Sequence, residues 1–310
     1  MTTSSSSTRG AISDLVSLSL PTLVHPQLRG ARDRPLRERV QWSMNFIRGI
    51  RGYSTSRKGS VLLPKHVDWR DRKGVFIKDQ GNALIPKHVD WRERGVVIPI
   101  KDQANSGLCG IFADVASVES IYKIRRNVSV ELSVQHVINR LARKFKKRGI
   151  DISETGLTDS HIFDCIMING IPLEEDFPYV GVPSMKDDFI PLPQFKNMYT
   201  IDSYKSIYPD EHNIMKHVVQ QPICATVDAS TWSKYGKWED DKVYGCDNKD
   251  HTLNHGVLLV GYGTEKGTPC WLVRNSYGTE FGDKGYTKIL RGENAFGIEE
   301  FLVFPILDPY

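Results

Sequence analysis

The sequence lacks several features that would place it in a specialised class of proteins. Its longest apolar runs, such as GVLLVGY at 256–262, fall far short of the roughly 20 residues that a membrane-spanning helix needs. A membrane-embedded protein is therefore not expected. The chain has 310 residues, 40% of them hydrophobic, which is enough to bury one large core or two modest ones.

Cysteine is scarce, and the five copies form no C-x-x-C pair. Their spacing suggests neither a zinc site nor a complete disulfide framework, because an odd count leaves at least one thiol free. An isolated cysteine ordinarily behaves as a small buried hydrophobe, and we interpret Cys165, Cys224 and Cys270 in this way. No metal site is expected.

Concentrated positive charge is missing from most of the chain. The formal net charge is +4, but residues 1–60 hold ten Lys or Arg against three Asp or Glu, so the excess belongs to this segment. A nucleic-acid partner is not expected, because neutralising phosphates needs a clustered basic face. The dense basic run RKFKKR at 143–148 ends a predicted helix, where cations favour the helix dipole.

The first 60 residues are rich in Ser and Arg, and Asp14 and several serines interrupt their apolar residues. They show no uninterrupted apolar stretch of the kind that a secretory signal requires. Two interpretations stay open. One is an organelle transit peptide with IRGYSTS at 50–56 as its processing site, and the other is a disordered extension.

An internal repeat follows this extension. LPKHVDWRDRKGVFIKDQGN at 63–82 is followed by IPKHVDWRERGVVIPIKDQAN at 85–105, and only the second copy continues into SGLCGIF. Six residues after Gln103 stands Cys109, whereas six residues after Gln80 stands Pro86. Residues 61–84 therefore read as a degenerate duplicate that cannot supply a nucleophile.

Helical spacing of apolar residues begins at Cys109, just after the second repeat copy. It predicts a helix over 109–124, with Gly107 allowing a tight turn into it. A second helix is predicted from a Ser133 cap to a stop at Gly149, and a third over about 160–169. After residue 195 the pattern changes to short β-type runs that glycines punctuate, such as HGVLLVGYG and CWLVRNS. Because helices precede strands, we expect the α+β class.

A nucleophilic thiol must lose its proton, and both a helix N-terminus and a neighbouring imidazolium lower a thiol pKa. The predicted helix places Cys109 at such an N-terminus. His255 lies in strand-like apolar sequence, and Asn275, at the end of WLVRNS, could hold its ring. These three residues are the candidate nucleophile, base and orienting group.

At this point the chain resembles the papain-like cysteine proteases over roughly 85–310. The resemblance rests on four blocks in order, IKDQANSGLCGIFA, LNHGVLLVGYG, WLVRNSYGTEFGDKGY and GIEEF with a following FP. It implies an α+β fold in which a helical half, about 109–195, faces a β-barrel-like half, about 196–310, across a cleft. It also implies that the Gln103 side chain and the Cys109 backbone N–H form an oxyanion hole.

Further expectations follow from the same resemblance. The substrate is a peptide or protein, the enzyme works as a monomer, and no cofactor is expected. The substrate-binding residues it implies are Thr158, Asp159, Asn254, Tyr277 and Phe301. Phe301 is found by counting back four from Pro305, and Glu300 takes its place if the register slips by one. Phe301 would close the pocket for the second residue before the scissile bond.

The sequence also departs from that family's pattern. Gly110 stands where a tryptophan is usual, Tyr277 and Phe281 replace two more, and Ser106 replaces a cysteine. The usual disulfides of the helical half are therefore not expected, which indicates a reducing compartment, although the family is typically lysosomal, vacuolar or extracellular. The family's inhibitory propeptide is not recognisable before residue 85.

Two alternatives to an active peptidase stay open. The departures would also suit a weak or inactive homologue that acts as a peptide-binding or inhibitory protein. The same arrangement of a Cys nucleophile, a His base and a polar orienting residue could serve a different thiol acyl transferase, such as a transglutaminase-like enzyme. Labelling of the thiol would test the first alternative, and product analysis with an added amine would test the second.

Overall fold

The computed structural model describes residues 76–78, 84–152, 156–181, 192–235, 238–239, 241–246 and 249–308. All of these fall within a unit that spans Ile50–Tyr310. The expectations for the extension 1–60 and for most of the duplicate 61–84 lie outside the described residues.

Three helices form where apolar spacing predicts them. They are α3 (Cys109–Arg126), α4 (Val134–Lys146) and α6 (Asp159–Asn169). The Ser133 side chain caps α4 by accepting the His136 backbone N–H at 3.0 Å, which satisfies an amide that the helix itself leaves without a partner. Helix α3 ends at Asn127, whose left-handed backbone (φ 53°) breaks the helical path.

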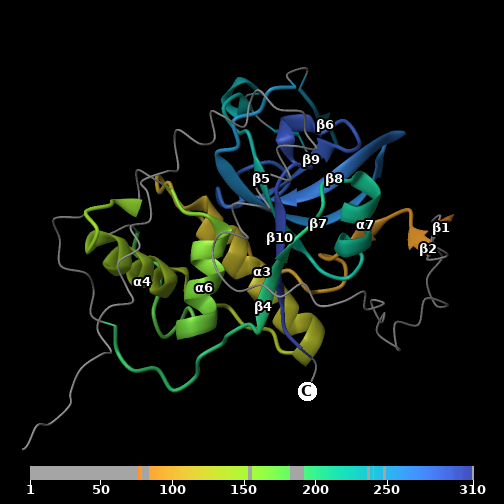
Figure 1. The fold of residues 1–310 in the computed structure, drawn as a ribbon. Helices are drawn as coiled ribbons and strands as arrows, with labels where there is room; N and C mark the ends of the chain where they lie inside the picture. Colours follow the sequence, from red (N-terminus) through yellow and green to blue (C-terminus); the bar gives the residue numbers. More distant parts are fainter. Residues whose placement is uncertain are drawn as a thin grey trace, which may run out of the picture. The chain divides into compact units, whose positions relative to one another are not determined.

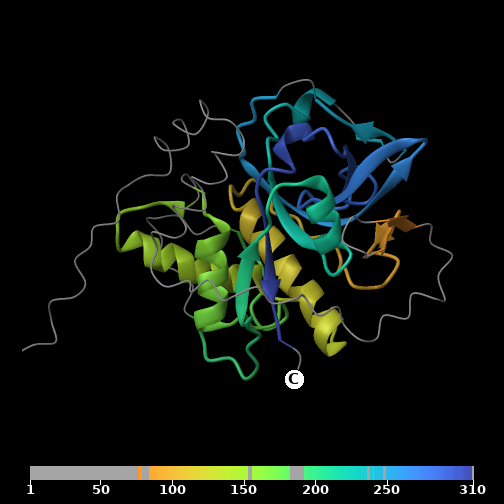
Figure 2. The same ribbon diagram turned by 45° about the vertical axis from the view of Figure 1, so that its right-hand side comes forward.

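Helix α3 joins the helices to the strands. Its buried residues pack against α4 and α6 on one side and against the sheet on the other, within one apolar cluster. Figure 1 shows α4 and α6 beside α3, and α3 beside the strands. Figure 2, turned by 45°, keeps the same arrangement. The first residue of α3 therefore lies where the helices meet the sheet.

The strands form one sheet with the order β4-β10-β5-β7-β8-β9-β6, and β3 pairs with β7 outside this path. Its strands are β3 (Val89–Asp90), β4 (Ser203–Ser206), β5 (Ile223–Val227), β6 (Val243–Tyr244), β7 (His255–Glu265), β8 (Thr268–Arg274), β9 (Tyr286–Leu290) and β10 (Leu302–Ile306). Only β6 and β9 pair in parallel among these strands. A short helix α7 (Glu211–Val218) and two 3₁₀ turns (Trp232–Tyr235 and Ala295–Gly297) complete this half.

Strand β7 is the longest of the described strands and pairs with three others. Its first part pairs with β5 and a later part with β3, while β8 runs along its other edge. A Cβ at Gly261 would lie 2.0 Å from the Val89 carbonyl oxygen, so only glycine lets β3 come this close. A separate two-stranded pair joins β1 (Phe76–Lys78), from the duplicate segment, to β2 (Leu84–Pro86).

The α+β class expected from the sequence is confirmed, although the short strands β1, β2 and β3 precede the helices and α7 lies between β4 and β5. All five cysteines are free thiols, and Cys165, Cys224 and Cys270 are buried. Among the described residues, no helix is both long and apolar enough to cross a bilayer. The domain boundaries drawn at residues 61, 85 and 196 stay predictions.

Candidate active site

Cys109 is the first residue of α3, as its sequence context predicts. Backbone amides at a helix start have no intrahelical acceptor, so they remain available to a ligand or to a developing negative charge. The Cys109 Sγ accepts the Gly256 backbone N–H at 3.2 Å. Two glycines allow this contact, because a Cβ on Gly256 would lie 2.8 Å from the Gly110 Cα. The start of α3 is thus pressed against the start of β7.

His255 is the first residue of β7 and is buried. Its Nε2 lies 2.8 Å from the Asn275 Oδ1, which also accepts the Ser276 backbone N–H at 2.8 Å. Because an amide oxygen can only accept, Nε2 must carry the ring proton. The Nδ1 atom of the neutral ring is therefore the acceptor, which is the role that a base needs.

Burial favours the neutral forms of both groups. It lowers the pKa of His255 to about 4, although the hydrogen bond to Asn275 acts in the opposite direction. Burial also raises the pKa of the Cys109 thiol, which the backbone amides of Gly256 and Gly110 partly offset and the charge of Asp159 reinforces. Burial alone thus opposes a charge on either group, whereas the hydrogen bonds from the Gly256 and Gly110 amides favour the thiolate.

Aromatic rings enclose the imidazole. The Tyr277 ring stacks on His255 with ring centres 4.8 Å apart, and Trp232 meets its edge at 5.4 Å. Phe281 in turn stacks on Trp232. The sequence drew attention to Tyr277 and Phe281, but it did not single out Trp232, which lies in a 3₁₀ turn far from the recognisable blocks.

Several hydrogen bonds hold Gln103 in place. Its Oε1 accepts the Ser276 hydroxyl at 2.5 Å, its Nε2 donates to the Ser106 carbonyl at 2.5 Å, and its backbone N–H donates to the Ser276 carbonyl at 2.8 Å. The second hydrogen on Nε2 remains for another acceptor. Ser276 was missed by sequence reasoning, although it directly follows Asn275 in the chain.

Asp159 does not simply line a cleft. Its charge acts on that of Asp114, a fully buried residue of α3 whose two carboxyl oxygens have no hydrogen-bond partner among the described residues. Burial raises the pKa of Asp159 to about 6 and that of Asp114 well above its ordinary value. Asp114 was also missed, but a charged residue on the apolar face of a predicted helix is a signal that could have found it.

The other predicted substrate contacts lie in different settings. Thr158 is exposed, and its hydroxyl contacts Ser160 and the His161 Nδ1. The Asn254 side chain braces a neighbouring loop by accepting the Ala229 N–H and donating to Ser230. A contact from Asn254 to substrate would therefore come from its backbone.

Phe301 is half-buried just before β10, and its carbonyl accepts the Thr226 N–H at 3.0 Å. Glu300, the alternative at this place, accepts a hydrogen bond from the Asn294 side chain at 2.9 Å. The substrate contacts of all five residues stay predictions.

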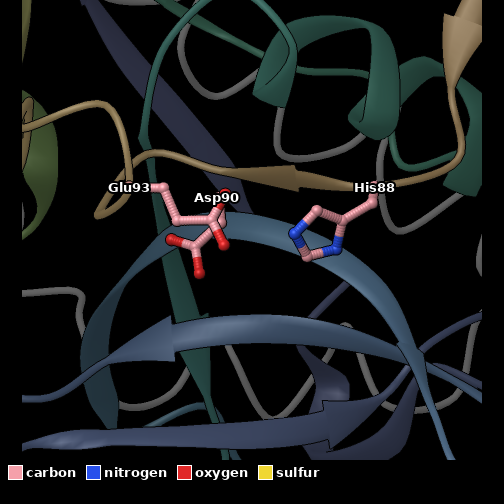
Figure 3. Close-up of side chains that lie close together, drawn as sticks. All are labelled: His88, Asp90 and Glu93. Atoms are coloured by element: carbon pink, nitrogen blue, oxygen red, sulfur yellow. The ribbon is translucent and has the colours of Figure 1, made fainter. Parts of the chain in front are cut away.

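One group of potential metal ligands lies at β3. His88, Asp90 and Glu93 place ligand atoms within 4.8 Å of one another (Figure 3). However, the Arg92 guanidinium donates to both oxygens of Asp90, at 2.7 to 3.0 Å. A metal ion would have to displace that cation, so this cluster is better explained as an ion pair with polar neighbours.

Comparison with known proteins agrees with this geometry. The family model described as "Papain family cysteine protease" matches residues 85–306. Cysteine proteinase 1 of Entamoeba histolytica is 33% identical over 79% of this chain and 70% of that protein. A KDEL-tailed cysteine endopeptidase of Arabidopsis thaliana is 34% identical over 84% of this chain and 64% of that protein.

Solved structures agree as well. The proform of the ragweed pollen allergen Amb a 11, a cysteine protease, has a TM-score of 0.62 at 32% identity, covering 72% of this chain and 66% of that one. Bromelain from Ananas comosus, in complex with the inhibitor E64, has a TM-score of 0.60 at 29% identity, covering 72% of this chain and all of the other.

Proposed function

Because the chain belongs to the papain family of cysteine proteases, we propose that it cleaves peptide bonds with Cys109 as nucleophile and His255 as base. The observation that carries the assignment is the hydrogen bond from the Gly256 N–H to the Cys109 Sγ at 3.2 Å. Gly256 directly follows His255, so this bond holds the thiol next to the imidazole. A general base must lie within reach of the proton that it removes.

The reaction proceeds in two stages on these groups. His255 Nδ1 takes the thiol proton, and the thiolate attacks the peptide carbonyl carbon. The tetrahedral oxyanion accepts hydrogen bonds from the Cys109 backbone N–H and from the Gln103 Nε2. The C–N bond then breaks, and the imidazolium gives its proton to the leaving amine, which leaves an acyl group on Cys109. Water, activated by His255, hydrolyses this thioester and restores the thiol.

Asn275 supports both stages by fixing the imidazole. Its Oδ1 accepts the Nε2–H at 2.8 Å, so the ring keeps the tautomer in which Nδ1 is basic. When the ring becomes an imidazolium, the same oxygen stabilises its positive charge. The enclosing rings of Tyr277 and Trp232 keep water away from this hydrogen bond.

The family indicates the class of substrate. A peptidase of this family acts on peptides or proteins. We place Phe301 in the pocket for the second residue before the scissile bond, with Thr158 and the Asn254 backbone along the peptide. Asp159, whose charge acts on Cys109, would lie beside the same peptide.

Labelling with iodoacetamide tests the assignment of the nucleophile. We expect Cys109 to be alkylated much faster than the other four cysteines in the folded protein, as peptide mapping by mass spectrometry would show. Cys109→Ala should lose peptide hydrolysis, whereas the matched control Cys246→Ala should keep it, because Cys246 is also partly exposed but lies outside the site. Activity that survives in Cys109→Ala would refute the mechanism.

The same assay separates the rival functions. An inactive homologue, which the comparisons do not favour, would bind peptides without cleaving them in the unmodified protein. A thiol acyl transferase would instead convert an added amine into an amide product in place of the free acid. We expect the free acid, with both peptide fragments released in equal amounts.

A further inference from the structure

The basic segment 140–148, which includes the end of α4, carries an unusual amount of charge. It holds six Lys or Arg and no Asp or Glu. Among them, Lys144, Lys147 and Arg148 are exposed. The helix dipole favours cations only within the last turn of a helix, whereas these cations extend from Arg140 to Arg148, beyond the end of α4 at Lys146. Capping of the helix alone therefore does not account for them.

This segment lies against the start of α6. The Phe145 ring meets the edge of the His161 ring, with ring centres 5.0 Å apart. Burial lowers the pKa of His161, and the charges of Lys144 and Arg148 lower it further, whereas Asp164 acts in the opposite direction. Both cations therefore lie close to the His161 ring.

The start of α6 also borders the catalytic site. Asp159, its first residue, acts on Cys109 through its charge. Thr158, which we place along the substrate, directly precedes Asp159, and its hydroxyl lies 3.0 Å from the His161 Nδ1. A short path thus leads from the nucleophile through Thr158 to His161 and its neighbouring cations.

This path lies on the side of the site that receives residues before the scissile bond. The Tyr204 hydroxyl of β4 donates to the Asp164 carboxylate of α6 at 3.1 Å, and β4 pairs with β10. Phe301, which we place in the pocket for the second residue before the scissile bond, directly precedes β10. A peptide that passes between Phe301 and Thr158 therefore continues toward the basic segment with its earlier residues.

We propose that Lys144 and Arg148 select substrates with acidic side chains in the third and fourth positions before the scissile bond. Four Asp or Glu follow between 149 and 164, so residues 140–164 keep a formal charge of +2. Two of these acids are engaged elsewhere, because Asp164 bonds to Tyr204 and Asp159 acts on Cys109. The inference rests on the proposed function, since it names the substrate class of the same site.

Three peptides test this selection. They share the scissile bond and a Val in the second position before it, and they carry Asp-Asp, Asn-Asn or Lys-Lys in the third and fourth positions. At low ionic strength we expect kcat/KM to rise about two- to fivefold for each Asp relative to Asn, the effect of an exposed ion pair, and to fall for Lys. Salt at about 1 M should remove the difference, because the Debye length shrinks to about 3 Å.

Two pairs of substitutions assign the effect to residues. Lys144→Gln with Arg148→Gln should bring the ratio of kcat/KM between the Asp and Asn peptides close to one, and Glu at both positions should invert it. Lys123→Gln with Arg125→Gln is the matched control, because it removes the same charge from the last turn of α3. That turn lies about 20 Å along the helix from Cys109, at a rise of about 1.5 Å per residue, so the control should keep the ratio.

A ratio near one in the unmodified protein would overturn the proposal, and so would a ratio that survives in Lys144→Gln with Arg148→Gln or falls equally in the control. If no peptide is cleaved, the proposed function fails, but the selection is still decided by binding. Fluorescence polarisation with Cys109→Ala and the three labelled peptides should give the same order of affinities, and equal affinities would overturn the proposal. A short RNA that bound these cations more tightly than the Asp peptide would also overturn it, by assigning them to nucleic acid.

Discussion

Gly256 donates its backbone N–H to the Cys109 Sγ across 147 residues of sequence. The bond joins the first turn of α3 to the first residues of β7, so the nucleophile and the base meet only when the helices pack on the sheet. Catalysis by this site thus depends on the long-range packing of the fold. Residues that fix β7 in the sheet should matter as much as residues that touch substrate.

Gly261 is such a residue. We expect Gly261→Ala to lower the free energy of unfolding by about 1–3 kcal/mol or more, because the new methyl would overlap the Val89 carbonyl and push β3 off β7. Urea denaturation would measure the change. Thr264→Ala, at an exposed position on the same strand, is the control and should change stability far less. Equal stability of the two variants would mean that β3 can shift without cost.

The oxyanion hole gives a second prediction. Gln103→Ala should lower kcat by about 10²–10³, because it removes one donor to the oxyanion. Ser276→Ala should lower kcat less, because it removes only the hydrogen bond from the serine hydroxyl to the Gln103 side-chain amide and leaves the oxyanion donor in place. If Ser276 acts through Gln103, its substitution should have little further effect in the Gln103→Ala background, which steady-state kinetics on the double variant would show. Additive losses would argue for independent roles.

The buried acid pair makes stability depend on pH. The pKa of Asp159 is about 6 in the folded protein, above its ordinary 3.8, so the folded state binds this proton more tightly than the unfolded state. The resulting stabilisation is complete below about pH 4 and is lost as the pH rises through about 6. Asp159→Asn should flatten this dependence in urea denaturation at pH 4 to 8.

The same substitution should also lower the apparent pKa of the Cys109 thiol, because it removes a negative charge that raises this pKa. Asp164→Asn is the control, since Asp164 lies on the same helix but bonds to the Tyr204 hydroxyl instead. An Asp159→Asn variant whose stability kept the original pH dependence would show that the pKa of Asp159 is not raised in the folded protein.

Local patterns predicted most of the fold. Apolar spacing with a serine cap located α4, and the apolar run from His255 located β7, because both signals arise from near neighbours in the chain. The order of the four family-like sequence motifs also identified Cys109, His255 and Asn275 as candidate catalytic residues. Strand order and register were not predictable in this way, because they depend on pairings such as β3 with β7 between distant segments.

The parts of the site that sequence reasoning missed have the same cause. Trp232 touches His255 only because the turn after β5 folds over the start of β7. The pKa of Asp114 is raised partly by the charge of Asp159, which is on another helix, so the sequence around Asp114 does not predict it. The Tyr277 ring stacks on His255 through the geometry of the loop after β8, and no spacing in the sequence encodes that contact.

The pocket for the second residue before the scissile bond gives the last prediction. Phe301 has no charge to pair with a basic side chain, and its ring shortens the pocket, so we expect a preference for Val or Leu over Arg. One methylene in an apolar pocket is worth only about 1–3 kcal/mol, so selectivity should be graded and not absolute. Phe301→Ala should widen acceptance toward large aromatic residues, as kcat/KM on a peptide series varied at this one position would show. Glu300→Ala is the matched control, because the Glu300 carboxylate is bound to Asn294. If the unmodified enzyme preferred Arg and lost that preference in Glu300→Ala, the pocket would belong to Glu300 and the assignment of Phe301 would be wrong.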